Sequence, residues 1–253
     1  MSSEKSTAII LRLVEFSETS LVVTLLTRDF GKLTAMAKGA RRKKSPFEGA
    51  LDLLAICRIV FLHKSSGAMD LLTEAKLERR FRSATKDLDR LYSGYYVAEL
   101  LNKMTDDADP HPELFELAER TIVSLDDPTT PVFGTLLRFE MRMLTLLGHR
   151  PMVNRCVRCG DEDSTTATKR RVYFGLLDGG LLCEQCRPGK TNVLSVARES
   201  VQFVDRMAQP EEGWQSIELQ LANKSEIRQM INRYITHLLG NPPRLQKYLK
   251  KIN

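Results

Sequence analysis

The stretch LVVTLLTRDFGKLTAMAK, residues 21–38, decides the expected fold because it contains two short strands joined by a tight turn. Residues 21–27 are β-branched and apolar, and residues 32–38 alternate between a small apolar face and a mainly polar one. An alternation with a period of two is typical of a half-buried strand. The intervening turn ends at Gly31, which can adopt the positive φ that hairpin turns often need. The stretch therefore predicts a β-hairpin.

Three similar runs flank the hairpin, at residues 7–15, 51–62 and 68–77. Five short strands within about 75 residues favour a small closed barrel of the OB type, and a half-open sheet is the alternative. Cys57 lies inside the apolar run at 51–62. We expect it to be a buried side chain that packs as a small hydrophobe.

The spacing of apolar residues changes after residue 80 from the period of a strand to that of a helix. Apolar stripes at helical spacing occupy residues 88–95, 114–125, 131–147, 195–208 and 223–239. The predicted fold class is therefore α+β, with a five-stranded OB-fold barrel followed by an α-helical domain that carries an inserted four-cysteine segment. The predicted domains are residues 1–80 for the barrel, 81–150 and 191–253 for the helical domain, and 151–190 for the insert.

Four of the five cysteines form two tight pairs, Cys156-x2-Cys159 and Cys183-x2-Cys186, with 23 residues between the pairs. A gap of two residues lets one turn aim two thiolates at the same ion, and four thiolates satisfy a tetrahedral zinc ion. An iron–sulfur cluster and a redox-active disulfide pair are the alternatives. Because four thiolates leave no coordination position for water, we expect one structural Zn²⁺ that holds an insert too small to fold by burial alone.

Basic residues are concentrated in the N-terminal part of the chain, whose formal net charge is +6 overall. Residues 1–80 contain 14 Lys and Arg against 9 Asp and Glu, a net charge of +5. Five of these cations lie within seven consecutive positions that contain no acid: Lys38, Arg41, Arg42, Lys43 and Lys44. Such crowding indicates an anionic partner, and a solvated loop is the alternative.

Several classes of protein are disfavoured by what the sequence lacks. No run of about 18 apolar residues is present, so we expect no membrane span. The beginning, MSSEKSTAIILRL, lacks the regions of a signal peptide, and we expect a cytoplasmic protein. The sequence contains no phosphate-binding loop, no HExxH and no GxSxG motif. We therefore expect that the chain is not an enzyme, with a metal-dependent nuclease as the disfavoured alternative.

A series of short motifs follows the chain from the first strands to the four-cysteine segment. The series is ETS at 18–20, Gly31, KGAR at 38–41, YSGYY at 92–96, ELL at 99–101, RFE at 138–140, LLG at 146–148 and the cysteine finger. In its order and spacing, this series resembles the RecO family of bacterial recombination mediators over nearly the full length of the chain. Some members of that family lack the cysteines, so the resemblance is to the metal-bearing branch.

The resemblance implies an OB-fold domain, an α-helical domain with a zinc finger inserted in it, and a role in the RecF pathway of DNA repair. It implies binding to single-stranded and double-stranded DNA and annealing of complementary strands. With RecR as a partner, such proteins help RecA to replace the single-strand-binding protein SSB. A nucleoid-associated location follows from these partners.

The basic loop and the resemblance together predict a DNA-binding face on the barrel. Strand alternation adds two cations to those of the loop, and the predicted DNA-binding residues are Arg12, Lys32, Lys38, Arg41, Arg42, Lys43 and Lys44. Phe30 and Phe47 are the aromatic residues nearest to loops, and both base stacking and core packing are open for them. A binding module of another kind, such as a zinc-ribbon transcription or ribosome-associated factor, is the alternative function.

The resemblance also implies that the helical domain binds the acidic tail of SSB, which ends in Phe. Such a tail needs an apolar pocket with a cation at its edge. Arg138 lies in the RFE motif, on the helix expected at 131–147, and is the predicted contact for the tail. An ordinary surface arginine that pairs with a neighbouring acid is the alternative.

Overall fold

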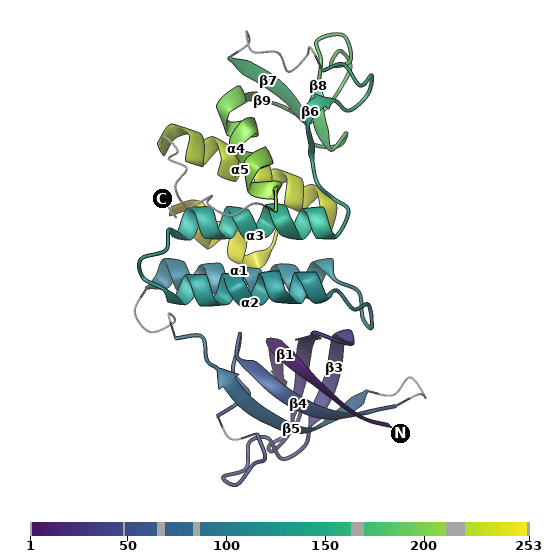
Figure 1. The fold of residues 1–253 in the computed structure, drawn as a ribbon, viewed down its shortest axis with the longest axis vertical. Helices are drawn as coiled ribbons and strands as arrows, with labels where there is room; N and C mark the ends of the chain where they lie inside the picture. The colour runs from purple at the N-terminus through teal and green to yellow at the C-terminus, as the bar shows by residue number, and fades with distance from the viewer. Residues whose placement is uncertain are drawn as a thin grey trace. The chain divides into compact units, whose positions relative to one another are not determined.

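The computed structural model describes residues 2–47, 49–64, 69–82, 87–162, 170–210 and 221–251. Its elements divide into two units, residues 1–130 and 131–253 (Figure 1). In the described part of the chain, the first unit contains five strands and two α-helices, and the second contains three α-helices, a small sheet and a C-terminal 3-10 helix. The finer division into domains that the sequence predicts stays a prediction.

A five-stranded closed barrel forms in the first unit, in the strand order β1-β2-β3-β5-β4. Its strands are β1 (Ser2–Glu15), β2 (Leu21–Thr27), β3 (Gly31–Ala37), β4 (Ile56–His63) and β5 (Asp70–Arg79). The 14 residues of β1 pair antiparallel with both β2 and β4, and a register shift between Ile10 and Arg12 lets the strand bend between its two neighbours. Parallel pairing of β3 with β5 completes the ring. The predicted OB-like barrel is confirmed.

The barrel interior is filled by the inward faces of all five strands. Its members include Ile10, Val23, Leu25, Ala35, Ile59, Phe61 and Leu72. Phe47 lies in this core, and Phe30 packs edge-to-face on Phe61 with 5.3 Å between ring centroids. Of the two roles left open for Phe30 and Phe47, the structure therefore shows core packing, with Phe47 inside the core and Phe30 packed against it.

The burial predicted for Cys57 is confirmed. Its side chain is fully buried in the barrel, and its Sγ donates to the carbonyl of Ala50 at 3.2 Å. Burial, with a smaller contribution from Glu78, raises the pKa of this thiol to about 12. The thiol is therefore neutral at physiological pH and acts as a small core side chain.

The predicted strand at 51–62 begins later than expected, since β4 starts at Ile56. The preceding residues form a turn in which Leu54 is fully buried and has a φ of 64°. The amide of Leu54 donates to the carbonyl of Ile10 at 2.8 Å, which seats the turn on β1. Apolar content alone does not separate a buried turn from a buried strand. The expected start of the fifth strand, residue 68, lies outside the described residues.

Helices α1 (Leu88–Met104) and α2 (Pro112–Asp126) belong to the same unit, and α1 packs on β1 and β2. Gly94 of α1 lets the side chains of Phe81 and Leu54 approach the helix closely, because an added Cβ would lie 2.7 Å from Phe81 and 2.8 Å from Leu54. The guanidinium of Arg90 donates to four main-chain carbonyls at the end of α2 and in the following turn, those of Leu125, Asp127, Pro128 and Thr130. These carbonyls would otherwise lack partners at a helix C-terminus.

The second unit combines helices α3 (Val132–Leu146), α4 (Arg198–Ala208) and α5 (Leu221–Leu239) with a four-stranded sheet. The sheet has the order β6-β8-β7-β9 and consists of β6 (Met152–Cys156), β7 (Arg171–Gly175), β8 (Gly180–Leu182) and β9 (Val193–Ala197). The chain ends in the 3-10 helix η4 (Arg244–Lys251). Among the described residues, none of the helices combines the length and hydropathy of a membrane-spanning segment.

The helix predicted at 195–208 begins at Arg198, because the residues before it pair with β7 as strand β9. Glu226 of α5 holds this junction together. Its carboxylate accepts from the amide of Ala197 at 2.7 Å, from Ser200 Oγ at 2.8 Å and from Arg171 at 2.8 Å. One side chain therefore ties α5 to two strands and to the first turn of α4.

A buried ion pair joins α3 to α5. Arg228 donates two hydrogen bonds to the carboxylate of Glu140, at 2.8 and 2.6 Å, and the side chain of Glu140 is 0% exposed. A charge placed in a protein interior needs such a partner, because its desolvation is costly. The RFE motif at 138–140 therefore supplies a structural carboxylate as well as the arginine that the sequence singles out.

Substitution of Glu140 by Leu should destabilise the chain strongly, by about 3–5 kcal/mol, because the Arg228 guanidinium would stay buried without its carboxylate. The double variant Glu140→Leu/Arg228→Leu should regain most of that loss, since no buried charge remains. Urea unfolding followed by circular dichroism measures both free energies. A double variant as unstable as the single one would show that the charge is not the cause.

Candidate metal centre and nucleic-acid interface

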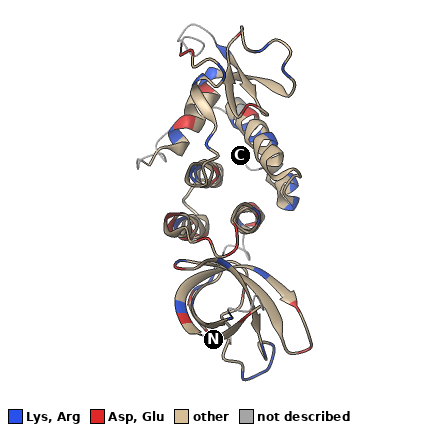
Figure 2. Cartoon of the chain, turned by 90° about the vertical axis from the view of Figure 1, so that its right-hand side faces the viewer, with Lys and Arg blue, Asp and Glu red and all other residues tan. Residues whose placement is uncertain are grey.

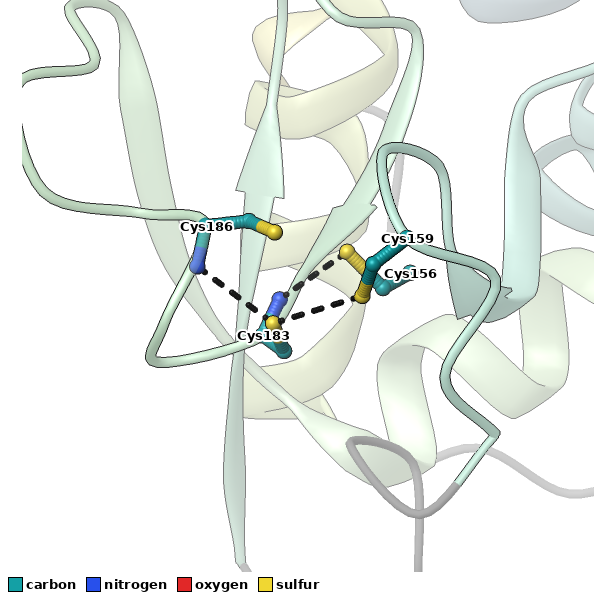
Figure 3. Close-up of side chains that lie close together, drawn as sticks. All are labelled: Cys156, Cys159, Cys183 and Cys186. Carbon is teal, nitrogen blue, oxygen red and sulfur yellow. Dashed lines mark hydrogen bonds between the residues drawn. The ribbon is translucent and has the colours of Figure 1, made fainter.

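The four paired cysteines meet at one point of the second unit. Cys156 ends β6, and Cys183 directly follows β8, so the pairing of these strands brings the two CxxC turns together. All four Sγ atoms lie within 4.8 Å of one another (Figure 3). The structure therefore assembles the complete set of metal ligands that the sequence predicts.

The two CxxC turns have similar local geometry. The amide of Gly160 donates to the carbonyl of Cys156 at 2.9 Å, and the amide of Arg187 donates to the carbonyl of Cys183 at 3.0 Å. Amides also point at sulfur, because Cys186 N lies 3.4 Å from Cys183 Sγ. Each turn thus aims its thiols at a common centre, and the amide of Cys186 stabilises negative charge on the sulfur of Cys183.

The sulfur spacing matches a single tetrahedral ion. Metal–sulfur bonds of about 2.3 Å in a tetrahedron separate neighbouring sulfurs by about 3.8 Å. The Sγ atoms of Cys159 and Cys183 are 3.8 Å apart. A multi-iron cluster places several atoms between its cysteine ligands and would need a wider spacing. Four sulfur donors at this spacing suit a soft or borderline ion such as zinc.

Asp178, which the sequence alone does not single out, supports both CxxC turns. Its Oδ1 accepts from Arg158 Nε at 2.6 Å and from Lys190 Nζ at 2.9 Å. Arg158 lies inside the first turn, and Lys190 follows the second. Burial raises the pKa of the Asp178 carboxyl, but the bonds from Lys190 and Arg158 outweigh it and lower that pKa. The carboxylate therefore positions the ligands without touching the metal site.

The cysteine thiols differ in acidity in the absence of metal. Burial raises the pKa of Cys156, but backbone hydrogen bonds from Cys159, Cys183 and Arg158 outweigh it and hold the pKa at about 6. Hydrogen bonds with the sulfurs of Cys183 and Cys159 raise the pKa of Cys186 to about 12. At Cys159, a backbone bond from Asp161 lowers the pKa, but neighbouring thiols and burial outweigh it, so the pKa is raised.

The basic loop of the first unit lies on the barrel surface, where Figure 2 shows it as a blue stretch of ribbon. Five of the predicted DNA contacts are exposed there: Lys38, Arg41, Arg42, Lys43 and Lys44. The loop is fixed at its base, because the amide of Arg41 donates to the carbonyl of Thr19 at 3.1 Å. Arg41 also pairs with Glu15 at 3.2 Å. Arg12 is exposed on β1.

Lys32 differs from these cations. Its Nζ donates to the carbonyls of Asn102 and Thr105 at 3.0 and 2.6 Å and lies 3.4 Å from Asp107, and its side chain is only 13% exposed. The ammonium therefore caps the end of α1 and joins the barrel to the helix. We drop Lys32 from the proposed DNA contacts, because strand alternation predicts its face but not the helix that covers it.

Arg138 also has a structural task. Its Nη1 donates to the carbonyls of Met207, at 2.8 Å, and of Gln209, both at the C-terminal end of α4. Arg142, one turn further along α3, donates to the neighbouring carbonyl of Ala208 at 3.0 Å. The two arginines together satisfy carbonyls that a helix end leaves without intrahelical partners. The sequence points to Arg138 but contains no local signal for this cap.

A cationic cleft lies elsewhere in the second unit, between α5 and the segment that contains Pro242, Pro243 and η4. It has a volume of about 930 Å³. The described residues that line it include Lys224, Arg228, Arg233, Arg244 and Lys247 but no carboxylate. The residues that carry these cationic groups lie far along the chain from the RFE motif at 138–140.

Comparisons with known proteins match the whole chain. Residues 1–81 match the family model described as "Recombination protein O N terminal", and residues 85–247 match "Recombination protein O C terminal". A "DNA repair protein RecO" of Rhodopirellula baltica is 41% identical, with 96% of this chain and 97% of the relative covered. One of Anaeromyxobacter dehalogenans is 31% identical, with 100% and 98% covered. One of Halalkalibacterium halodurans is 34% identical, with 72% and 68% covered.

Metal affinity should increase steeply with pH near neutrality. Since the pKa of Cys186 is about 12 and that of Cys159 is raised, both thiols are protonated before zinc binds. Binding must release at least these two protons, so the apparent affinity for Zn²⁺ should rise at least about 100-fold per pH unit and fall correspondingly as the pH falls. Competition with a chromogenic chelator at several pH values measures it.

A Cys57→Ala variant is the matched control, because it removes a buried thiol but no predicted ligand. It should retain zinc as the wild type does, whereas Cys159→Ser should lose it. An affinity that does not change with pH would contradict the assigned protonation states.

Proposed function

Because the chain belongs to the RecO family of DNA repair proteins, we propose that it is a recombination mediator that binds DNA through the basic loop of its barrel. It binds single-stranded and double-stranded DNA, anneals complementary strands and, with RecR, helps RecA to replace SSB. Its place of work is the cytoplasmic nucleoid. The observation that carries this proposal is the run of exposed cations at 41–44, held beside the β1–β2 loop.

The proposed binding is driven by charge. Each Lys or Arg that contacts a phosphate releases condensed counterions, which makes the affinity strongly dependent on salt. Such contacts track the sugar–phosphate chain without reading bases, as a mediator that acts on any sequence requires. Exposure of the loop cations supports this role, because each can reach a phosphate without first breaking a buried contact.

We propose that Cys156, Cys159, Cys183 and Cys186 hold one Zn²⁺ with a structural role. The spacing of the four sulfurs supports a mononuclear tetrahedral site. Zinc would supply the folding free energy that the small sheet of the second unit cannot gain from burial alone. Because four thiolates fill the coordination shell, the site is unsuited to activating water, and the proposed function involves no catalytic step.

Replacing Arg41, Arg42, Lys43 and Lys44 by Ala should make DNA binding less sensitive to salt. The slope of log K against log[salt] on single-stranded DNA should flatten by about 3, from roughly −0.7 per lost phosphate contact. Fluorescence anisotropy over a range of salt concentrations measures the slope. The same variant should lose annealing of SSB-coated complementary oligonucleotides.

Arg120→Ala is the control for this variant, since it removes an exposed charge from α2 in the same unit. Its salt slope and annealing rate should equal those of the wild type. A loop variant with an unchanged slope would show that DNA binds elsewhere, and a wild type that ignores oligonucleotides in dilute buffer would overturn the proposed function.

We further propose that the acidic tail of SSB binds the second unit, at the cationic cleft beside α5. An acidic peptide that ends in an aromatic residue needs cations around a space large enough for the ring. The cleft of about 930 Å³ supplies Arg233 and Lys247 for this purpose. Arg138, the contact expected from the sequence, has its Nη1 engaged with carbonyls of α4, so we assign it a supporting role in the fold.

The variants Arg233→Glu and Lys247→Glu should each weaken binding of an acidic, Phe-ending peptide, because they reverse a charge at the cleft. We expect a loss of roughly tenfold or more, the size of a charge-assisted contact. Arg138→Ala should lower thermal stability and leave peptide affinity nearly unchanged. Isothermal titration calorimetry with the peptide measures the affinities. A loss of peptide affinity in Arg138→Ala, without a loss in the two cleft variants, would instead support Arg138 as the contact for the tail.

A further inference from the structure

We infer that Phe16 is a stacking platform for an unpaired base, which makes the barrel face prefer single-stranded over double-stranded nucleic acid. The inference rests on the proposed function, since it needs the basic loop to bind the backbone of the same strand. It adds a residue that the sequence does not suggest, because Phe16 stands in an unremarkable polar context after β1.

The exposure of Phe16 is the first observation. The ring is 63% exposed, and Phe16 and Tyr248 are the two aromatic side chains that are exposed among the described residues. The aromatic rings next to the other loops of the barrel, Phe30 and Phe47, are taken up by its core. Single exposed apolar side chains are common on protein surfaces, so the exposure of Phe16 points to a ligand only together with the groups around it.

The position of Phe16 beside the basic loop is the second observation. Its amide donates to the carbonyl of Ser20 at 3.0 Å, so the β1–β2 loop is a tight turn. The carbonyl of Thr19 in that turn accepts from the amide of Arg41 at 3.1 Å. Arg41 also pairs with Glu15, the residue before the ring. Main-chain bonds therefore hold the ring and the loop cations side by side.

The outer face of the barrel continues from Phe16 as an apolar row. The strand register aligns Val14 with Val22, and Val22 with Met36. Their neighbours Leu13, Val23 and Ala35 pack in the core, so alternation turns this row outward. Val14 is 39% exposed, and Val22 and Met36 are half-buried. Arg12 and Lys38 flank the row on β1 and after β3.

This combination of groups fits single-stranded nucleic acid. In OB folds, the face of strands 2 and 3 and the loop between strands 1 and 2 are the usual place for oligonucleotides. Cations beside an aromatic ring bind the phosphates and a base of the same strand without regard to sequence. A duplex hides its base faces within the stack, so it can use the cations but not the ring. An acidic protein segment is the alternative ligand for this face, and the experiment must distinguish it from single-stranded nucleic acid.

The test compares the full-length wild type with Phe16→Ala on three probes that differ in whether they offer an unpaired base. The probes are an oligothymidylate, an abasic oligomer with the same number of phosphates, and a duplex of the same length. Phe16→Ala should weaken binding to the oligothymidylate by about 5- to 100-fold, the range of one lost base stack. Its affinity for the abasic and duplex probes and its salt slope should not change, since no charge is lost.

Two further variants keep the test specific. Phe16→Tyr should restore oligothymidylate binding, because it keeps an aromatic face. Leu88→Ala is the matched control, since Leu88 belongs to the same unit and is equally exposed at 63%; it should bind all probes as the wild type does. Circular dichroism confirms that each variant is folded.

The outcomes separate this inference from the proposed function. If the wild type binds DNA and Phe16→Ala binds every probe equally well, the inference fails and the proposed function stands. If Phe16→Ala weakens the abasic probe as much as the oligothymidylate, stacking is excluded. A loss confined to an acidic peptide would assign the ring to a protein partner and also overturn the inference. If the wild type binds none of the probes, the proposed function itself fails.

Discussion

The double pairing of β1 is the constraint on which the first unit depends. One strand of 14 residues is hydrogen-bonded to β2 along its second half and to β4 along its first half. Together with the parallel pairing of β3 and β5, this pairing removes the free edges of the sheet and closes the barrel. The antiparallel order β1-β2-β3 sets the loop after β1 beside the loop after β3, since Leu21 pairs with both Glu15 and Ala37. The bond between Arg41 and Thr19 joins the two loops. The candidate DNA-binding surface is therefore a product of this antiparallel pairing.

Two sets of cations in this chain differ in what surrounds them. Lys32, Arg90 and Arg138 end in clusters of main-chain carbonyls, where they donate hydrogen bonds to helix ends. The loop cations at 41–44 are exposed. The same residue types thus serve structure in one place and are available to a polyanion in another. The two sets differ because a helix end presents several main-chain carbonyls to a nearby cation, whereas the basic loop lies away from such an end.

The second unit relies on polar and thiol contacts for its organisation. Its small sheet brings four thiols together, and Asp178 braces both of the turns that carry them. Glu226 and the Glu140–Arg228 pair connect α5 to the sheet and to α3. Each of these carboxylates has several donors around it, as burial of charge requires. A metal ion held by the four cysteines would stabilise this unit by joining its two CxxC turns.

Periodicity in the sequence was sufficient to predict the five strands, the helices and the barrel type. The CxxC spacing was sufficient for the metal ligands, because two residues between thiols define a turn within a few bonds. Boundaries were predicted less well. Leu54 reads as part of a strand but is buried in a turn, and the residues of β9 read as the start of a helix. Their conformation depends on partners that lie far away in the sequence.

What the sequence determined by itself was the kind of each local element and the charge of the loop, since both follow from neighbouring side chains. Only the tertiary structure decided which cations and aromatic rings stay available to a ligand. Lys32 is covered by α1, Phe30 and Phe47 fill the barrel, and Phe16 remains outside. The physical reason is that exposure is a property of packing between distant segments. No local pattern contains that information.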